Sequence, residues 1–179
     1  MLLVRHCESS GPWPEAPLTD RGRAQAVRLA DFLTEYRIDA IVSSPYRRAR
    51  DTIAPFAGAT GLAVSIDPRL AERRMSEEPD ADWRGTLRRS FDDPEHRLPG
   101  AESARETVAR GRAAIEDLLT GTWRMPVAVS HGQLIGLVLH TLDARFGFTR
   151  WEEMSTPDVY LLVADGGPVR FERVWREAG

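Results

Sequence analysis

The sequence predicts an α/β fold, a three-layer α/β/α sandwich built on a mainly parallel sheet. Short apolar runs alternate along the chain with segments whose apolar residues recur at helical spacing, which is typical of parallel strands covered by helices on both faces. Near the C-terminus, two apolar runs flank Asp165-Gly166-Gly167, a turn signal that indicates a hairpin. We therefore expect an antiparallel edge on an otherwise parallel sheet.

The first elements are expected to form a βαβ unit. The apolar run 2–4 predicts a buried strand that ends at Arg5 and His6. Thr19 can cap the helix that follows. The apolar stripe of that helix consists of Ala26, Leu29, Ala30 and Leu33. A second strand is expected over residues 39–43.

The next helix is predicted to begin directly after the second strand. Ser44 suits its N-cap, and Pro45 suits the first helical position, where a missing N–H group costs nothing. The helix is expected over residues 46–57. A strand over residues 62–66 should follow it.

The second half of the chain supplies the remaining elements. Residues 103–106 form a capping box that opens a long helix. A strand over residues 126–130 is expected to lead into a buried helix over residues 134–142. The predicted hairpin pairs strands over residues 159–163 and 169–174.

Composition narrows the classes of function. The chain of 179 residues has no evident linker or repeat, so residues 1–179 are expected to fold as one domain. A net charge of −3 argues against a nucleic-acid partner, which requires a basic surface. All 24 basic residues are arginine, which excludes P-loop and Schiff-base chemistry because both require lysine. The exclusive use of arginine also indicates a bacterial gene.

The sequence also carries signals of cellular location. No apolar run reaches the roughly 18 residues that span a membrane, and no signal-peptide pattern precedes Leu2. The single cysteine, Cys7, excludes an internal disulfide framework and fits a reducing compartment. We therefore expect a soluble, cytoplasmic protein with no membrane partner.

Two histidines follow two of the predicted strands. His6 ends the first strand, and His131 ends the strand over residues 126–130. Because the carboxyl ends of parallel strands meet at one edge of a sheet, both histidines are expected in one pocket. Arg47 and Arg48 follow another strand at the same edge, and their planar guanidinium groups suit phosphate oxygens.

Four separated blocks of the chain resemble the histidine phosphatase superfamily, in its phosphoglycerate-mutase-like branch. The blocks are Arg5-His6, Ser43-Ser44-Pro45 with Arg48-Ala49, Leu70-Ala71-Glu72, and Ser130-His131-Gly132. The resemblance covers nearly the whole chain and implies a phosphoglycerate-mutase-like fold. It also implies a phosphatase that needs no cofactor and forms a phosphohistidine intermediate. No paired histidines occur at metal-ligand spacing, so no metal site is expected.

The resemblance also implies roles for individual residues. The family's first histidine attacks phosphorus, so His6 is the expected nucleophile, with one ring nitrogen unprotonated and the other held by an acceptor. Arg5, Arg48 and a protonated His131 would surround the phosphate, and the arginines would keep the nucleophile neutral. Glu72 stands where the family's acid usually lies. It is expected to protonate the leaving oxygen and later to activate water.

Two of these positions carry alternatives. Arg48 competes with Arg47 and Arg50, because an arginine in an exposed first turn is usually a solvated charge; the family register favours Arg48. Cys7 replaces the small glycine or alanine that the family commonly has after its first histidine. Cys7 is either a redox-sensitive thiol beside the pocket or a small buried side chain, and we favour the second interpretation.

The acid and one phosphate ligand also have competitors. Glu77 or Glu78 could replace Glu72 if the loop that contains them folds inward. The family's other branch often has an aspartate directly after the second histidine; here Gly132 stands there, which favours Glu72. Ser9 is a candidate phosphate ligand through its hydroxyl group, with stabilisation of a turn as an equal alternative.

Residues 73–99 form a charged insert that we expect to face the substrate, a small intracellular phosphate ester. The insert, which contains Trp83 and Arg88, is either a solvated helical cap or a lid that reads the rest of the substrate and excludes water. Trp13 and Trp151 look exposed, and these aromatic residues could line either a homodimer interface or the lid.

The expected activity is metal-independent hydrolysis of a phosphomonoester. Two alternatives stay open: a phosphoglycerate-type mutase, and a noncatalytic phosphate-binding regulatory module. The family's glycolytic mutases usually carry an asparagine where this chain has Pro12, which argues against the mutase. The presence of the whole set of expected site residues argues against the noncatalytic module.

Overall fold

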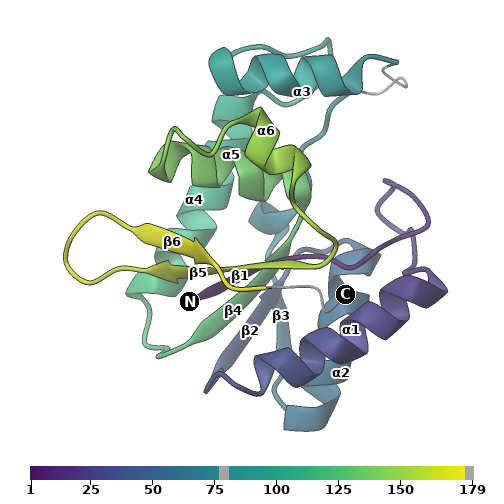
Figure 1. Ribbon diagram of the computed structural model, residues 1–179, viewed down its shortest axis with the longest axis vertical. Helices are drawn as coiled ribbons and strands as arrows, with labels where there is room; N and C mark the ends of the chain where they lie inside the picture. Colours follow the sequence, from purple (N-terminus) through teal and green to yellow (C-terminus); the bar gives the residue numbers. More distant parts are fainter. Residues whose placement is uncertain (77–80, 176–179) are drawn as a thin grey trace.

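Within residues 1–76 and 81–175, which the computed structural model describes, the chain folds around a six-stranded sheet in the order β3-β2-β4-β1-β5-β6 (Figure 1). The strands are β1 (Leu2–Arg5), β2 (Ala40–Ser43), β3 (Val64–Ile66), β4 (Pro126–Ser130), β5 (Asp158–Val163) and β6 (Arg170–Arg173). The pairs that join β1, β2, β3 and β4 are parallel. β5 runs antiparallel to both β1 and β6. The predicted parallel sheet with an antiparallel C-terminal edge is confirmed.

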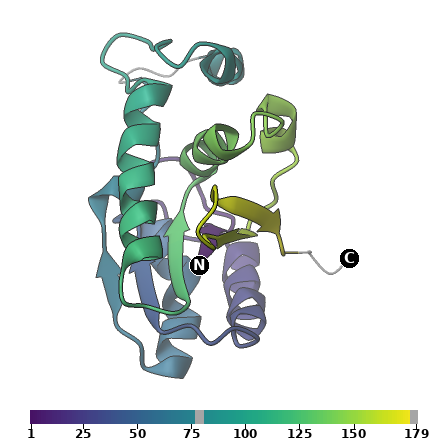
Figure 2. The same ribbon diagram turned by 90° about the vertical axis from the view of Figure 1, so that its left-hand side faces the viewer.

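Helices cover both faces of this sheet. They are α1 (Asp20–Leu33), α2 (Arg47–Thr60), α3 (Trp83–Asp92), α4 (Ala104–Thr120), α5 (Gly132–Leu142) and α6 (Phe148–Glu152), with a 3₁₀ turn at Pro68–Leu70. α1 packs with α2 on one face and α4 packs with α5 on the other, while α3 lies at the end of the molecule beyond α5 and α6 (Figure 1, Figure 2). The predicted three-layer sandwich is confirmed. None of the helices in the described ranges is both long and apolar enough to cross a membrane.

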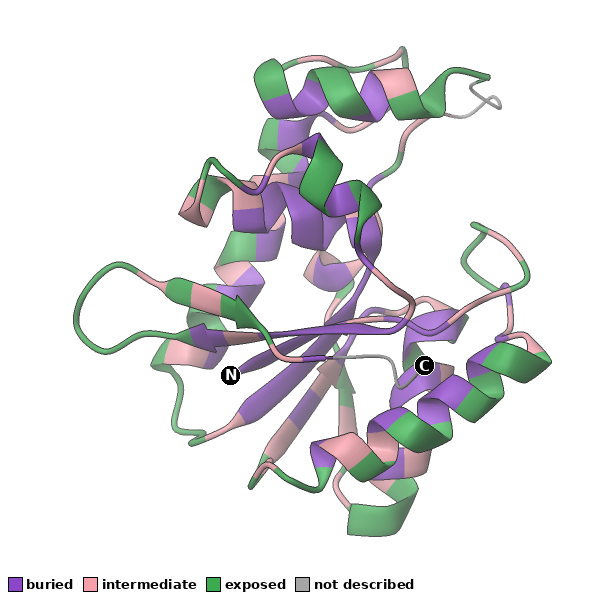
Figure 3. Cartoon of the chain, in the orientation of Figure 1, coloured by how far each residue is buried: buried purple, intermediate pink, exposed green. Residues whose placement is uncertain are grey.

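Strand β1 shows why the central strands are apolar without a break. Leu2 and Val4 pack into the core on the α1 and α2 side, whereas Leu3 packs into the core on the α4 and α5 side. Successive side chains of a strand point to opposite faces, so a strand covered on both faces needs a continuous apolar run. Figure 3 shows this burial concentrated in the central strands and on the sides of the helices that face them.

Two predicted helix caps are confirmed. Thr19 is the N-cap of α1, and its side-chain oxygen accepts a hydrogen bond from the backbone N–H of Gly22 at 3.0 Å. Ser103 and Glu106 form both hydrogen bonds of the predicted capping box at the start of α4. These bonds satisfy N–H groups that have no partner within the helix.

The start of α2 differs from the prediction. Tyr46 is the N-cap and the helix begins at Arg47, so the predicted start, with Ser44 as N-cap and Pro45 as first helical residue, is wrong by two residues. The Ser44 hydroxyl oxygen accepts the backbone N–H of Tyr46 at 3.2 Å, but the hydroxyl also bonds to the ring of His131. The backbone N–H of Arg47 donates to the carbonyl oxygen of Pro14, so the first turn is held by the preceding loop.

The carboxyl ends of β1, β2 and β4 meet at one edge of the sheet. Arg5 at the end of β1 is in register with Ser130 at the end of β4. Just beyond, the backbone N–H of His6 donates to the carbonyl oxygen of Ser130 at 3.0 Å, and that of Ser44 donates to Val129 at 2.9 Å. The backbone thus brings three of the predicted site segments together.

The insert over residues 73–99 contains α3, and its residues 77–80 lie outside the described ranges. Trp83 of α3 stands edge-on to Trp151 of α6, with ring centroids 6.0 Å apart. Trp151 is 7% exposed and belongs to the core, so of its two predicted positions it lies against the insert and not on an exposed surface. Trp13 is 61% exposed, and a homodimer stays a prediction.

Gly22 provides a test of how the loop after the first histidine packs on α1. A Cβ atom at Gly22 would stand 2.0 Å from the carbonyl oxygen of Glu8. We expect Gly22→Ala to lower the free energy of unfolding by about 1–3 kcal/mol, because the loop or the helix must move. Gly58→Ala in α2 is the matched control: its Cβ would meet open space, and alanine should stabilise the helix by about 0.5–1 kcal/mol. Urea denaturation measures both changes, and an unchanged stability of Gly22→Ala would contradict this packing.

Candidate active site

Arg5 extends from the end of β1 toward the start of α5. Its Nη1 donates a hydrogen bond to the carbonyl oxygen of Met154 at 2.9 Å. A Cβ atom at Gly132 would stand 3.0 Å from Nε of Arg5, so the glycine leaves room for the guanidinium. This Nε is buried and has no hydrogen-bond partner among the described residues. Arg5 therefore presents a donor that a ligand could satisfy.

His6 has its two ring nitrogens in different environments. Nδ1 lies 2.7 Å from the carbonyl oxygen of Cys7, which can accept but not donate, so Nδ1 carries the proton and Nε2 a lone pair. Nε of Arg48 donates to this Nε2 at 3.1 Å. Burial, together with the charge of Arg48, lowers the pKa of His6 to about 3. His6 is therefore neutral at pH 7, the state that nucleophilic attack requires.

Arg48 is the buried member of the three arginines at the start of α2. It is 3% exposed, whereas Arg47 and Arg50 are exposed. Nη1 of Arg48 donates to the carbonyl oxygens of Pro12 and Trp13, both at 2.9 Å. These bonds tie the loop that follows the first histidine to α2. The competition between neighbouring arginines is thereby resolved by burial: Arg48 is the one that enters the site.

His131 is fully buried at the start of α5, with its ring centroid 5.0 Å from that of His6. Its Nε2 lies 2.7 Å from the hydroxyl oxygen of Ser44, which also accepts the backbone N–H of Tyr46 at 3.2 Å. Nδ1 is buried without a hydrogen-bond partner among the described residues. Ser44 is thus a site residue that the sequence interpretation missed. Its position just past the end of β2, at the same edge as the histidines, is the signal that could have found it.

The protonated His131 expected around a phosphate stays a prediction, and the ligand-free protein has a different state. Burial, followed by the neighbouring His6 and Arg48, holds the pKa of His131 well below its ordinary value. The ring is therefore neutral at pH 7. The contact with Ser44 fits either tautomer of the neutral ring. In the tautomer that accepts from the Ser44 hydroxyl at Nε2, the ring proton lies on Nδ1, where it can donate one hydrogen bond to a ligand.

Glu72 follows the 3₁₀ turn and lies against the N-terminus of α5. One carboxylate oxygen accepts the backbone N–H groups of Arg73 at 2.9 Å and Leu134 at 3.1 Å. The other oxygen accepts the N–H of Gln133 at 3.2 Å. A helix N-terminus offers such donors to a carboxylate. Because α5 follows directly after His131, these bonds hold Glu72 on the side of the site where the second histidine lies.

The remaining sequence candidates lie in simpler surroundings. The hydroxyl group of Ser9 donates to the carbonyl oxygen of Gly11 at 3.1 Å, which fits the turn-stabilising alternative; its contact with phosphate stays a prediction. Cys7 is fully buried, as expected of a small side chain in the core. Glu77 and Glu78, the alternatives to the predicted acid, lie outside the described residues.

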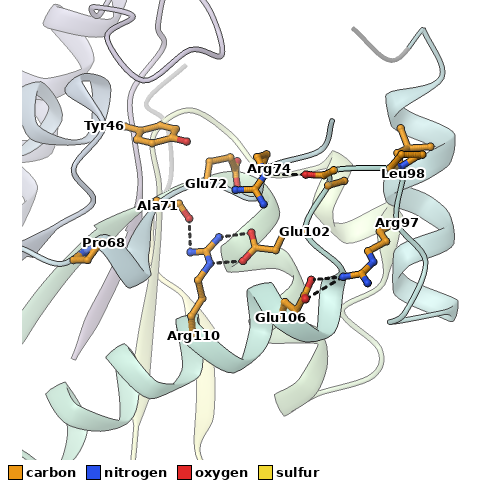
Figure 4. A pocket seen from close by; sticks show the side chains of 13 residues that line it. Tyr46, Pro68, Ala71, Glu72, Arg74, Arg97, Leu98, Glu102, Glu106 and Arg110 are labelled. Carbon is orange, nitrogen blue, oxygen red and sulfur yellow. Dashed lines mark hydrogen bonds and ion pairs between the residues drawn. The ribbon is translucent and has the colours of Figure 1, made fainter. Parts of the chain in front are cut away.

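A cavity of about 990 Å³ borders this group of side chains (Figure 4). Tyr46 and Glu72 line it, as do residues from both ends of the insert 73–99. Trp83 and Arg88, the insert residues singled out from the sequence, pack instead on aromatic rings of α6. The ends of the insert, rather than α3, therefore face the cavity.

The arrangement suits an anion rich in oxygen acceptors. Two guanidinium groups converge on two neutral histidines, and two buried nitrogen atoms, Nε of Arg5 and Nδ1 of His131, lack partners among the described residues. A phosphate group would supply acceptors and offset the positive charge. No cluster of three or more His, Cys, Asp or Glu side chains that could hold a metal ion occurs in the part of the chain that the structure describes.

Comparison with known proteins places the chain in a family. The model of the histidine phosphatase superfamily (branch 1) matches residues 1–176. The "Probable phosphoglycerate mutase GpmB" of Shigella dysenteriae is 32% identical over 175 residues, which cover 86% of this chain and 77% of the relative.

Comparison with solved structures supports this family assignment. The mycobacterial glucosyl-3-phosphoglycerate phosphatase, in a complex with VO3, is 26% identical with a TM-score of 0.77, and the match covers 100% of this chain and 98% of that one. The phosphoserine phosphatase of Entamoeba histolytica, in a complex with 3-phosphoglyceric acid, shares the fold at 20% identity, with a TM-score of 0.72 and coverage of 98% and 96%. The chain therefore belongs to the histidine phosphatase superfamily, branch 1.

Proposed function

We propose that the protein is a phosphomonoesterase that needs no metal ion and transfers the phosphoryl group through His6. The observation that carries the proposal is the tautomer of the His6 ring. Its proton lies on Nδ1, which faces the carbonyl oxygen of Cys7, and its lone pair lies on Nε2, beside Arg48. The likeness to a mycobacterial phosphatase supports hydrolysis as the outcome. The substrate is a small phosphate ester, and the single cysteine favours the reducing cytoplasm as its compartment.

The first step forms a phosphohistidine. Arg5, Arg48 and the Nδ1–H of His131 hold the phosphate oxygens and stabilise the charge that develops on them. Nε2 of His6 attacks phosphorus, so that an N–P bond forms while the P–O bond to the alcohol breaks. Glu72, in its protonated form, gives its proton to the departing oxygen. The positive charge on the phosphorylated ring is stabilised by the carbonyl oxygen that its Nδ1–H contacts.

The second step returns the site to its starting state. Glu72, now a carboxylate, takes a proton from a water molecule as the water oxygen attacks phosphorus. The N–P bond breaks, the lone pair returns to Nε2 of His6, and inorganic phosphate leaves. The three backbone N–H groups that hold the carboxylate keep it in one orientation through both steps.

A mutase is the second candidate, because a relative at 32% identity is named as one. A mutase returns the phosphoryl group to the product alcohol, whereas a phosphatase gives it to water. With 3-phosphoglycerate as substrate, we expect release of inorganic phosphate, no 2-phosphoglycerate, and no stimulation by 2,3-bisphosphoglycerate. Isomer formation that depends on the bisphosphate would establish the mutase instead.

Hydrolysis of p-nitrophenyl phosphate in the presence of EDTA tests the main proposal. We expect the wild type to remain active and His6→Ala to lower kcat by ~10³-fold or more, because the phosphoenzyme cannot form. His140→Asn, at the far end of α5, is the matched control and should retain turnover. Activity that survives His6→Ala, or that EDTA abolishes, would refute the proposal.

Burial of neutral His6 also predicts how stability depends on pH. The folded pKa of about 3 lies below the ordinary value of 6.5, so between these values the unfolded chain binds a proton that the folded chain does not. The contribution of neutral His6 to the free energy of unfolding is fully present above pH 6.5. It is lost as the pH falls, and about 2 kcal/mol of it is gone at pH 5.

Urea denaturation of the wild type and His6→Asn at pH 7.5 and pH 5 measures this loss. We expect the wild type to lose more stability than the variant on acidification. Equal losses in the two proteins would contradict the neutral state of His6. His96→Asn, which removes a histidine from outside the site, controls for the substitution itself.

A further inference from the structure

The cavity beside the proposed phosphate site holds the rest of the substrate. Tyr46 joins the two spaces: its ring lies 5.0 Å from the ring of His131, and the guanidinium of Arg48 lies 4.9 Å from its centroid. Glu72, the proposed acid, lines the same cavity. An ester whose phosphorus lies at His6 therefore extends its alcohol into this space.

The size of the cavity exceeds what a three-carbon alcohol needs. Its volume of about 990 Å³ lies at the upper end of the ~300–1,000 Å³ range of ligand pockets. It equals the liquid volume of on the order of 30 water molecules. An alcohol of sugar size would displace much of this water, whereas a three-carbon group would leave most of it in place.

The guanidinium of Arg110, which lines the cavity, forms four hydrogen bonds with groups of the protein (Figure 4). Its Nε and Nη2 meet the two carboxylate oxygens of Glu102 at 2.6 and 2.8 Å. Its Nη1 donates to the carbonyl oxygens of Arg69 and Ala71, both at 2.7 Å. The pair is partly buried, with side chains 22% and 16% exposed, so solvent screens it only in part. Arg110 therefore uses four of its five N–H donors within the protein, and its charge is offset by Glu102.

Arg97 also pairs with a carboxylate, although its side chain and that of Glu106 are 53% and 52% exposed, so solvent screens this pair more strongly. Its Nη1 lies 3.0 and 3.1 Å from the two carboxylate oxygens of Glu106. Arg74, the third guanidinium of the wall, donates from Nε to the carbonyl oxygen of Gly100. Among the described lining residues, three guanidinium groups thus face three carboxylates, which are Arg74, Arg97, Arg110, Glu72, Glu102 and Glu106.

The cavity wall therefore differs in charge from the phosphate site. At the phosphate site, Arg5 and Arg48 donate to backbone carbonyl oxygens and to His6, and no described carboxylate accepts a hydrogen bond from either guanidinium. In the cavity wall, Arg97 and Arg110 are paired with carboxylates, and the charge of Arg74 is balanced while Glu72 is ionised. A second anionic group would lose its hydration there and meet carboxylates as often as guanidiniums. Hydroxyl groups can form hydrogen bonds with both kinds of side chain, because they donate to carboxylates and accept from guanidinium N–H groups.

We infer that the substrate is the phosphate ester of a neutral, hydroxyl-rich alcohol of sugar size, without a carboxylate or second phosphate. The inference rests on the proposed phosphatase function. Apolar atoms of Pro68, Leu98 and Pro99 complete the wall and suit the C–H groups of such an alcohol.

Substrate pairs that differ in one charged group test the inference. Glycerol 3-phosphate and 3-phosphoglycerate share a three-carbon skeleton, and sorbitol 6-phosphate and 6-phosphogluconate share a six-carbon skeleton. We expect kcat/KM to be about 10-fold higher for the neutral member of each pair, and highest for sorbitol 6-phosphate. A ten-fold ratio corresponds to about 1.4 kcal/mol. Equal values, or a preference for the acids, would overturn the inference.

Variants that release a guanidinium should change this preference. Glu102→Gln keeps the shape of the side chain but removes the charge that neutralises Arg110, and Glu106→Gln does the same for Arg97. We expect both to raise the acid-to-neutral ratio of kcat/KM by about 5- to 10-fold, which is about 1–1.4 kcal/mol. Because the ratio is taken within one enzyme, a loss of folded protein cancels.

Glu116→Gln is the matched control, because Glu116 pairs with Arg112 on the same helix and neither residue lines the cavity. Its acid-to-neutral ratio of kcat/KM should equal that of the wild type, and a ratio changed as much as in Glu102→Gln would contradict a local effect.

Hydrolysis of p-nitrophenyl phosphate distinguishes failure of this inference from failure of the proposed function. If it is hydrolysed but the neutral esters are not preferred, the inference alone fails. If no ester is hydrolysed, the proposed function fails and the inference with it.

Discussion

Two guanidinium groups and two histidines are buried together at one edge of the sheet, and backbone carbonyl oxygens accept most of their hydrogen bonds. The negative charges of Glu72 and Asp158 act on Arg5, and that of Glu72 also acts on Arg48. Among the described residues no carboxylate bonds directly to either guanidinium, and burial of cations without such partners is unfavourable in the absence of a ligand. The same surroundings hold the pKa of both His6 and His131 below the ordinary value. A bound phosphate would offset this positive charge. We therefore interpret the site as preorganised for an anion, with the neutral His6 as the proposed nucleophile.

A few contacts with the backbone fix the loop and the side chains of this site. The loop after the nucleophile candidate is tied to α2 by the bonds of Arg48 to Pro12 and Trp13, and it rests on α1 at Gly22. The N-terminus of α5 holds the carboxylate of Glu72. Beyond this edge, Arg97 and Arg110 of the cavity wall are paired with carboxylates. In the proposed account, separate sets of side chains bind the phosphate and select the alcohol, and the two sets meet at Tyr46 and Glu72.

The strand pattern was sufficient to predict the fold and to bring His6 and His131 to one edge, because local apolar runs determine where strands end. It could not predict contacts that depend on packing across the chain. The residues around Ser44 predict a helix cap, yet its hydroxyl group bonds to the ring of His131, 87 residues away in the sequence. Trp151 reads as exposed but is covered by α3. The pairing of Arg110 with carbonyl oxygens up to 41 residues away likewise has no local signal, so the charge balance of the cavity emerges only from the structure.

The most direct test of the central claim is capture of the covalent intermediate. Wild-type protein would be mixed rapidly with ³²P-labelled p-nitrophenyl phosphate, quenched in alkali, and digested to locate the label. We predict label on the peptide that contains His6, stable in alkali and lost in acid, as expected of an N–P bond, and absent from His6→Ala. Continued turnover with no alkali-stable label on that peptide, or label on another residue, would contradict phosphoryl transfer through His6.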